Sequence, residues 1–210
     1  MTQLSVAPEL KTIAAGKGVK IPADIIINWV EDAKGKSAMM VKPTKTDFFV
    51  EDEWVIILTG IEFSNGVIEF DALGQSDPPQ SNFLGISFRF VDEWTHDAVY
   101  FRPFNFRAGD PERMAHALQY ISHPKHHWFN LRKEKTGLYE KPIVPVIDGD
   151  TWFHARIVID KPKVSVYVND SKEPSLEVEE LSDRMGGGIG FWVGPGQGGH
   201  FANLTIIPAA

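Results

Sequence analysis

The chain has 210 residues, of which 43% are hydrophobic and 23% charged, a composition typical of a globular protein with a sizeable core. Its 21 basic and 28 acidic side chains give a net charge of −7, which disfavours non-specific binding to nucleic acid or to anionic membranes. The absence of cysteine excludes disulfides, thiolate metal sites and a cysteine nucleophile.

The sequence carries no sign of membrane insertion or export. No segment approaches the roughly 18 uninterrupted apolar residues of a membrane span. The first 20 residues lack the apolar centre of a signal peptide, which favours the cytoplasm. A periplasmic or extracellular location would follow if a signal had been removed.

Short segments rich in Val, Ile, Phe and Trp, each bounded by Gly, Pro, Asn or Asp, follow one another along the chain. We expect strands at residues 25–30, 38–41, 54–63, 67–72, 83–90, 98–101, 152–160, 164–168, 188–193 and 202–207. This pattern predicts an all-β sandwich or barrel with one domain over residues 1–210. Alternation within the strands predicts a core that contains Ile68, Phe70, Ile86, Phe88, Phe101, Ile157, Ile159, Val166, Phe191 and Leu204.

The segment GVIEFDA at residues 66–72 carries two carboxylates on one strand. Asn65-Gly66 favours the positive φ angles of a type I′ turn and predicts a β-hairpin corner. Beyond it, Glu69 and Asp71 project from the face opposite the apolar residues 68, 70 and 72. Such a pair could begin a catalytic pair, a metal site or a sugar-binding face, and the strand by itself does not say which.

Two later strands show the same alternation. If these strands are neighbours, one polar, aromatic-edged surface contains Glu69, Asp71, Ser87, Arg89, Tyr100 and Arg102. Sugar recognition uses forked donors, carboxylate acceptors and an aromatic plane, which such a surface supplies. A solvated sheet face with cross-strand ion pairs accounts for the pattern equally well.

Residues 104–145 form a long, mostly irregular segment between two groups of strands. Asp110 can cap a helix that begins at Pro111 and ends near Leu118. Long segments of this kind are often functional, and we expect this one to fold over a sheet face and wall a pocket. Its polar and aromatic residues are Asn105, Arg107, Arg113, His116, Gln119, Tyr120, His123, Trp128, Arg132, Tyr139 and Glu140.

Taken together, these segments resemble the concanavalin A-like lectin and glucanase superfamily. GVIEFDA and FLGISFR (83–89) resemble its central strands, TWFHARIVID (151–160) with KVSVYVND (163–170) is similar to the hairpin of laminin-G-like modules, and GGGIGFWVG and FANLTI resemble its closing strands. YFRPFNF (100–106), QYISHP (119–124) and GLYE (137–140) look like a bacterial laminin-G-like group of unassigned activity. The resemblance implies a two-sheet antiparallel jelly-roll sandwich with one short helix in a long loop.

The resemblance carries the superfamily's functional residues over only in part. Glu69 and Asp71 match the first two positions of the hydrolase motif Glu-x-Asp-x-x-Glu, but Gly74 stands at the third, so Glu140 or Asp92 would have to supply the general acid. Glu69 and Asp71 also resemble the metal ligands of the legume-lectin strand, and Asp77 resembles a later ligand. The three carboxylates that include Glu69 are fewer than the six to eight oxygens that calcium takes. We therefore expect no cofactor, with calcium left open.

A histidine cluster in the long segment suggests a metal site at first glance. His123, His126 and His127 stand in His-Pro-Lys-His-His, with no helix to align the rings and no cysteine or carboxylate at ligand spacing. We predict a solvated loop and no tight transition-metal site.

The function that these observations favour is non-catalytic binding of carbohydrate or polysaccharide, with no nucleic-acid partner. The ligand-binding residues would be Glu69, Asp71, Arg89, Tyr100, Arg102, Asn105, Arg113, His116, Gln119, Trp128 and Arg132. One alternative is a glycoside hydrolase or lyase that uses Glu69 as base or nucleophile and His116 or Glu140 as proton donor. Another is an interaction domain, which would show a flat apolar patch and no pocket.

Overall fold

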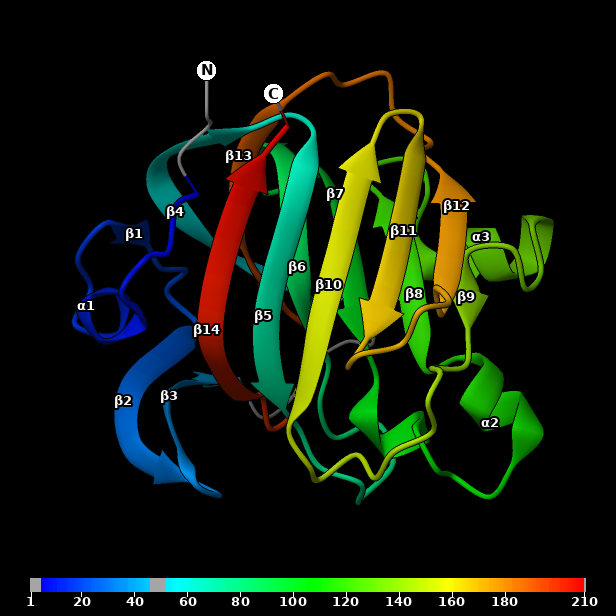
Figure 1. The fold of residues 1–210 in the computed structure, drawn as a ribbon, viewed down its shortest axis with the longest axis horizontal. Helices are drawn as coiled ribbons and strands as arrows, with labels where there is room; N and C mark the ends of the chain where they lie inside the picture. The colour runs from blue at the N-terminus through cyan, green and yellow to red at the C-terminus, as the bar shows by residue number, and fades with distance from the viewer. Residues whose placement is uncertain (1–4, 46–51, 210) are drawn as a thin grey trace.

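The computed structural model describes residues 5–45 and 52–209, and two antiparallel sheets pack face to face in it (Figure 1). Sheet I has the order β1 (Val19–Lys20), β4 (Trp54–Phe63), β13 (Gly187–Val193), β6 (Leu84–Asp92), β7 (Thr95–Phe101), β8 (Leu118–Ser122) and β9 (Glu140–Lys141). Sheet II has the order β12 (Leu176–Glu179), β11 (Lys163–Val168), β10 (Phe153–Asp160), β5 (Gly66–Leu73), β14 (Gly199–Pro208), β3 (Lys36–Pro43) and β2 (Ile25–Ala33). The predicted all-β, two-sheet jelly-roll sandwich is confirmed.

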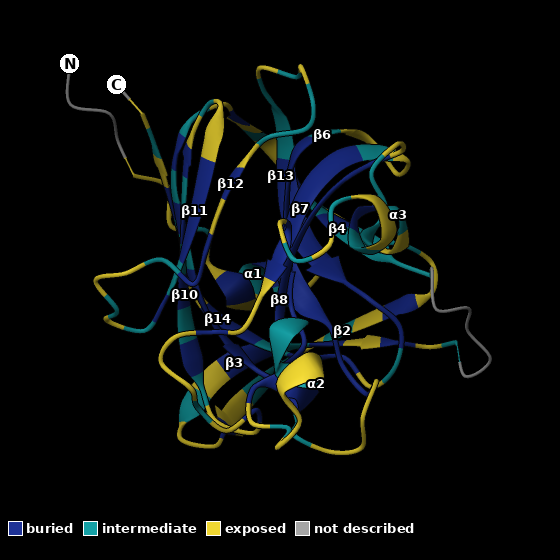
Figure 2. Ribbon diagram, turned by 90° about the vertical axis from the view of Figure 1, so that its right-hand side faces the viewer, coloured by how far each residue is buried: buried dark blue, intermediate teal, exposed yellow. Residues whose placement is uncertain are grey.

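The core fills the space between the two sheets (Figure 2). Aromatic rings cross this space: the ring centroids of Phe70 in sheet II and Phe101 in sheet I lie 6.4 Å apart, and those of Phe191 in sheet I and Phe201 in sheet II lie 4.6 Å apart. Burial confirms every predicted core residue, namely Ile68, Phe70, Ile86, Phe88, Phe101, Ile157, Ile159, Val166, Phe191 and Leu204. Strand alternation therefore identified the inward faces correctly.

The predicted hairpin at Asn65-Gly66 is wrong. The turn follows β4 directly, but β4 belongs to sheet I and β5 to sheet II, so it carries the chain from one sheet to the other. A Cβ at Gly66 would lie 2.8 Å from the Cα of Pro208, and the φ angle of Gly66 is +140°. Glycine is needed here for a close crossing of the end of β14 rather than for a type I′ turn.

The long segment 104–145 is more regular than its sequence indicates. Within the described residues it contains a 3₁₀ turn η1 (Pro103–Asn105), α2 (Pro111–Ala115), β8, α3 (Trp128–Glu134) and β9. Asp110 caps α2 as predicted, because its side chain accepts a hydrogen bond from the Glu112 N–H at 2.9 Å. The helix ends at Ala115 because the chain then enters β8, which extends sheet I beside β7.

The remaining helix, α1 (Leu10–Ala14), buries Leu10 and Ile13 in the core. It contacts β2 and β3 at the edge of sheet II. None of the described helices has the length and hydrophobicity that a membrane-spanning helix requires.

Candidate functional site: an aromatic pocket on sheet I

A pocket of about 350 Å³ lies on sheet I beside the segment that follows β7. It is lined by Asp52, Glu53, Pro79, Gln80, Phe83, Tyr100, Arg102, Asn105, Arg113, His116, His127, Trp128, Arg132, Trp192 and Pro195. On β7 the neighbours of Tyr100, Val99 and Phe101, belong to the core. Alternation therefore turns Tyr100 to the face of sheet I that points away from sheet II.

Two stacked aromatic rings form part of the pocket lining. Gly85 on β6 pairs with Tyr100 on β7 and with Trp192 on β13. Because Gly85 has no side chain, the flanking rings meet above it, with centroids 4.1 Å apart and planes 21° apart. A Cβ at Gly85 would lie 2.6 Å from the Cβ of Tyr100. The glycine thus makes room for a continuous aromatic surface.

Arg102 lies at the end of β7 and is buried beside these rings. Its guanidinium donates hydrogen bonds to the Tyr100 hydroxyl at 2.8 Å and to the His116 carbonyl at 2.7 Å. It also lies 4.9 Å from the Tyr100 ring centroid. Burial raises the pKa of Tyr100 to about 12. The phenol therefore stays protonated and can hold the guanidinium in place at any physiological pH.

Glu140 on β9 anchors Arg132 and lies beside His116 behind the pocket. It accepts two hydrogen bonds from Arg132 at 2.9 and 2.7 Å, and its carboxylate lies 2.8 Å from the His116 Nδ1. Arg132 and Trp128 stand four residues apart on α3, so they share one helix face and the guanidinium lies 4.8 Å from the indole centroid. Burial lowers the pKa of His116, which Glu140 partly offsets.

Two polar groups of the pocket have capacity for a ligand. Arg113 on α2 donates to the Asn105 side chain at 3.3 Å and to the Phe104 carbonyl at 2.9 Å. Both acceptors are uncharged, so neither neutralises the guanidinium. The Trp192 Nε1 is buried and has no hydrogen-bond partner among the described residues. A buried donor of this kind is normally paired, which a bound molecule could achieve.

The structure gathers most of the predicted ligand-binding residues in this pocket, namely Tyr100, Arg102, Asn105, Arg113, His116, Trp128 and Arg132. Gln119 is buried behind it and accepts a hydrogen bond from Arg102 at 3.3 Å. Glu140, a candidate proton donor, lies behind it as well.

Glu69 and Asp71 do not belong to this face, which corrects the expected common surface. Both lie on β5 in sheet II, whereas Arg102 follows β7 in sheet I. Glu69 pairs with Arg156 at 3.4 Å, and Asp71 accepts hydrogen bonds from Lys36 and Asn203, each at 2.7 Å. Alternation identifies the side of its strand to which each residue points, but it does not identify the sheet to which the strand belongs. The expectation of no cofactor, with calcium near Asp71 and Asp77 as the alternative, stays a prediction.

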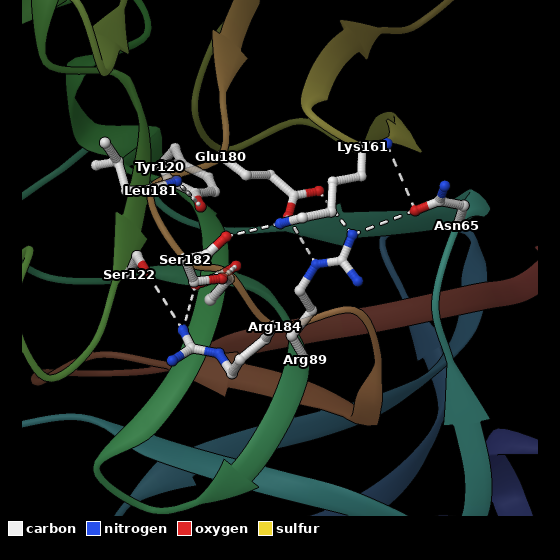
Figure 3. Close-up of polar contacts among 10 residues, drawn as sticks. Asn65, Arg89, Tyr120, Ser122, Lys161, Glu180, Leu181, Ser182 and Arg184 are labelled. Atoms are coloured by element: carbon white, nitrogen blue, oxygen red, sulfur yellow. Dashed lines mark hydrogen bonds and ion pairs between the residues drawn. The ribbon is translucent and has the colours of Figure 1, made fainter.

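Arg89 is also separated from the pocket. A register shift in β6 and a left-handed φ of +49° at Arg89 interrupt the alternation there. The guanidinium donates to both carboxylate oxygens of Glu180 at 2.7 Å, and the side chains of this pair are fully buried (Figure 3). Lys161 and Asn65 complete this cluster.

We expect the Asp71 carboxylate to stabilise the folded protein. Burial raises its pKa, but hydrogen bonds from His154, Lys36 and Asn203 outweigh that effect and bring the pKa to about 2. Because the folded-state pKa is depressed, the ionised carboxylate stabilises the fold. This stabilisation is fully present above the unfolded-state pKa near 3.9 and is lost as the pH falls through the folded-state pKa of about 2.

The substitution Asp71→Asn should therefore cost about 2 kcal/mol of unfolding free energy at pH 6. The difference from wild type should shrink between pH 4 and pH 2 in urea unfolding curves. A difference that is independent of pH would mean that the carboxylate charge makes no contribution.

Several pocket residues were missed, among them Phe83, Trp192, Asp52 and Glu53. Trp192 could have been found, because it alternates with the core residue Phe191 on β13. Glu53 could not have been found in this way, because it belongs to no recognisable sequence motif. It lies with His96 and His123, and the ligand atoms of the three side chains are all within 4.8 Å of one another. The predicted solvated loop is wrong for His123, which is buried and whose ring centroid lies 4.1 Å from that of His127. His126 is not part of the group with Glu53.

Comparison with known proteins supports the fold. No protein-family model matches the chain, and no curated protein matches it in sequence. A carbohydrate-binding module, CBM66 from Bacillus subtilis, is similar in structure with a TM-score of 0.55 and 12% identity over 87% of this chain and 95% of its own. A protein of unknown function with a galectin-like fold from Bacillus subtilis gives a TM-score of 0.60 and 12% identity over 100% and 97%.

A candidate glycosyl hydrolase from Parabacteroides distasonis gives a TM-score of 0.50 and 13% identity over 98% of this chain and 100% of its own. At these identities the similarity shows the jelly-roll sandwich alone. A laminin-G-like relationship is not confirmed.

Proposed function

We propose that this protein binds carbohydrate in the pocket on sheet I. The observation that carries the proposal is the combination of a stacked Tyr100–Trp192 surface with the guanidinium groups of Arg102, Arg113 and Arg132 around one hollow. Aromatic planes cover the apolar faces of a sugar ring, and forked donors match its paired hydroxyl groups. Carbohydrate-binding CBM66, which shares the fold, is consistent with this use of it.

A flat interaction surface is less consistent with the structure, because a hollow with convergent polar groups is typical of a small-ligand site. The enzyme alternative built on Glu69 is not retained, since Glu69 lies in the sheet opposite His116 and Glu140. A hydrolase or lyase at this site would have to use groups of the pocket itself. Release of reducing ends from a bound polysaccharide would reveal such an activity.

Trp128→Ala provides the test. Trp128 is half-buried at the start of α3 and lines the pocket, so its loss removes an aromatic wall. We expect binding to a panel of soluble neutral and uronic acid-containing polysaccharides, measured by affinity electrophoresis, to weaken about tenfold or more, while the melting temperature changes little.

Trp94→Ala is the matched control. Trp94 is 74% exposed and lines a second hollow beyond Glu53 rather than the pocket. Binding that is lost in Trp94→Ala and kept in Trp128→Ala would place the ligand in the second hollow and contradict the proposal. Wild-type protein that binds no member of the panel would contradict it as well.

A further inference from the structure

Three side chains from distant parts of the sequence converge beside the pocket. Glu53 precedes β4, His96 lies on β7 and His123 follows β8. The Glu53 carboxylate lies 3.0 Å from the His123 Nε2 and 3.2 Å from the His96 Nε2. Ligand atoms of a single tetrahedral zinc ion are about 3.3 Å apart, given bonds of about 2.0–2.2 Å. The two distances to Glu53 are close to this value, and the ligand atoms of all three side chains lie within 4.8 Å of one another, so one ion can be shared among them.

His96 supplies an independent observation. It is fully buried, yet neither ring nitrogen has a hydrogen-bond partner among the described residues. The 3.2 Å contact of its Nε2 with Glu53 does not have hydrogen-bond geometry. Buried ring nitrogens normally have a partner, and this one is directed at the carboxylate that a metal ion would share.

We propose that Glu53, His96 and His123 bind one divalent transition-metal ion. Two imidazoles and one carboxylate are a ligand set that zinc and ferrous iron both take, with further coordination positions left open. Glu53 lines both the pocket and the second hollow, so the ion would lie behind the wall that the two share. This departs from the sequence-based expectation of no tight transition-metal site, which considered only the histidines of one loop.

The competing explanation is an ion pair between Glu53 and His123 that needs no metal. Burial raises the pKa of Glu53, but contacts with His123 and His96 outweigh it and bring the pKa to about 2. The carboxylate is therefore ionised in either case, and only metal binding itself distinguishes the two explanations.

The first experiment is a titration of chelator-treated protein with zinc chloride. Binding is measured by isothermal titration calorimetry in the absence of any glycan. We expect one equivalent to bind and to raise the melting temperature. The isosteric variant Glu53→Gln and the variant His96→Asn should each bind more than about 100-fold more weakly, because a lost ligand costs more than a lost outer-shell partner.

His126→Ala is the control, because His126 lies in the same loop outside the group. Its zinc affinity should equal that of wild type. No saturable binding by wild-type protein, or equal binding by all variants, would overturn the proposal.

If the ligand variants fail to fold, cobalt-loaded wild-type protein decides. Two paramagnetically shifted imidazole N–H protons are expected in its NMR spectrum, one from each histidine ligand. Their absence would overturn the proposal. Since no step uses carbohydrate, a negative glycan screen and a negative metal titration are separate results.

Discussion

Glu180→Gln should destabilise the protein by about 3–5 kcal/mol, because it removes the only negative charge from a buried cluster whose other charged members are Arg89 and Lys161 among the described residues. The Arg89 and Glu180 side chains are fully inaccessible, and the Arg89 Nη1 has no hydrogen-bond partner in the part of the chain that the structure describes (Figure 3). Water cannot replace the missing charge at such a position. Urea unfolding at pH 7 measures the loss.

Glu177→Gln is the matched control. It removes the same group from an exposed pair with Lys163, where the N–O distance is 3.0 Å and the Glu177 side chain is 47% accessible. Exposed pairs contribute about 0–1 kcal/mol, so this variant should stay near wild type. A loss below about 1 kcal/mol in Glu180→Gln would show that water enters the cluster.

The double variant Arg89→Met/Glu180→Leu extends the test. It should recover part of the loss, because a buried ion pair can often be replaced by apolar groups of similar volume. Arg89 does not line the pocket, so carbohydrate binding by folded protein should not change. A loss of binding would instead support the ligand-binding role predicted for Arg89 from its alternation with Phe88.

The sequence predicted the sandwich and half of the pocket for the same reason. Alternation places Phe88 and Phe101 inside and Tyr100 outside wherever the strands lie, and Tyr100 leads directly to Arg102 and the segment that walls the pocket. The error at Glu69 has the complementary cause. The pleat says which way a side chain points from its strand, but the connection after β4 crosses to the other sheet, and no local pattern encodes that.

The group of Glu53, His96 and His123 shows a second limit. Its members come from three separate elements, and only the order of strands in sheet I brings them together. Metal-ligand motifs are recognisable in sequence when a helix or a tight loop fixes their spacing. Here the spacing depends on tertiary structure, so the His-Pro-Lys-His-His loop drew attention to His126 instead of His96.

Glu140→Gln should produce the second large effect, a loss of about 3–5 kcal/mol together with weaker carbohydrate binding. The Glu140 carboxylate is buried, holds Arg132 by two hydrogen bonds and lies 4.0 Å from the buried Arg102 guanidinium. Without its charge both arginines lose their acidic partner, and the pocket side of α3 loses its anchor.

Arg132→Gln separates the two roles of Glu140. The Arg132 side chain is 33% accessible, and its loss leaves Glu140 beside His116 and Arg102, so stability should fall much less than in Glu140→Gln. Binding should weaken in both variants, since both lose the guanidinium position that stacks on Trp128. Equal stability losses would mean that the Arg132 pair, and not the neutralisation of Arg102, is what Glu140 contributes.

The His116 titration gives a readout that a purely structural defect would not move. Burial lowers the pKa of His116, and Glu140 raises it in part through its negative charge 2.8 Å from the Nδ1. Removal of that charge in Glu140→Gln should therefore lower the His116 pKa further below its ordinary value, and the imidazole should stay neutral to lower pH. An NMR titration of the ring protons in wild type and Glu140→Gln measures the shift. A pKa that stays the same or rises would show that Glu140 does not set the charge of the pocket.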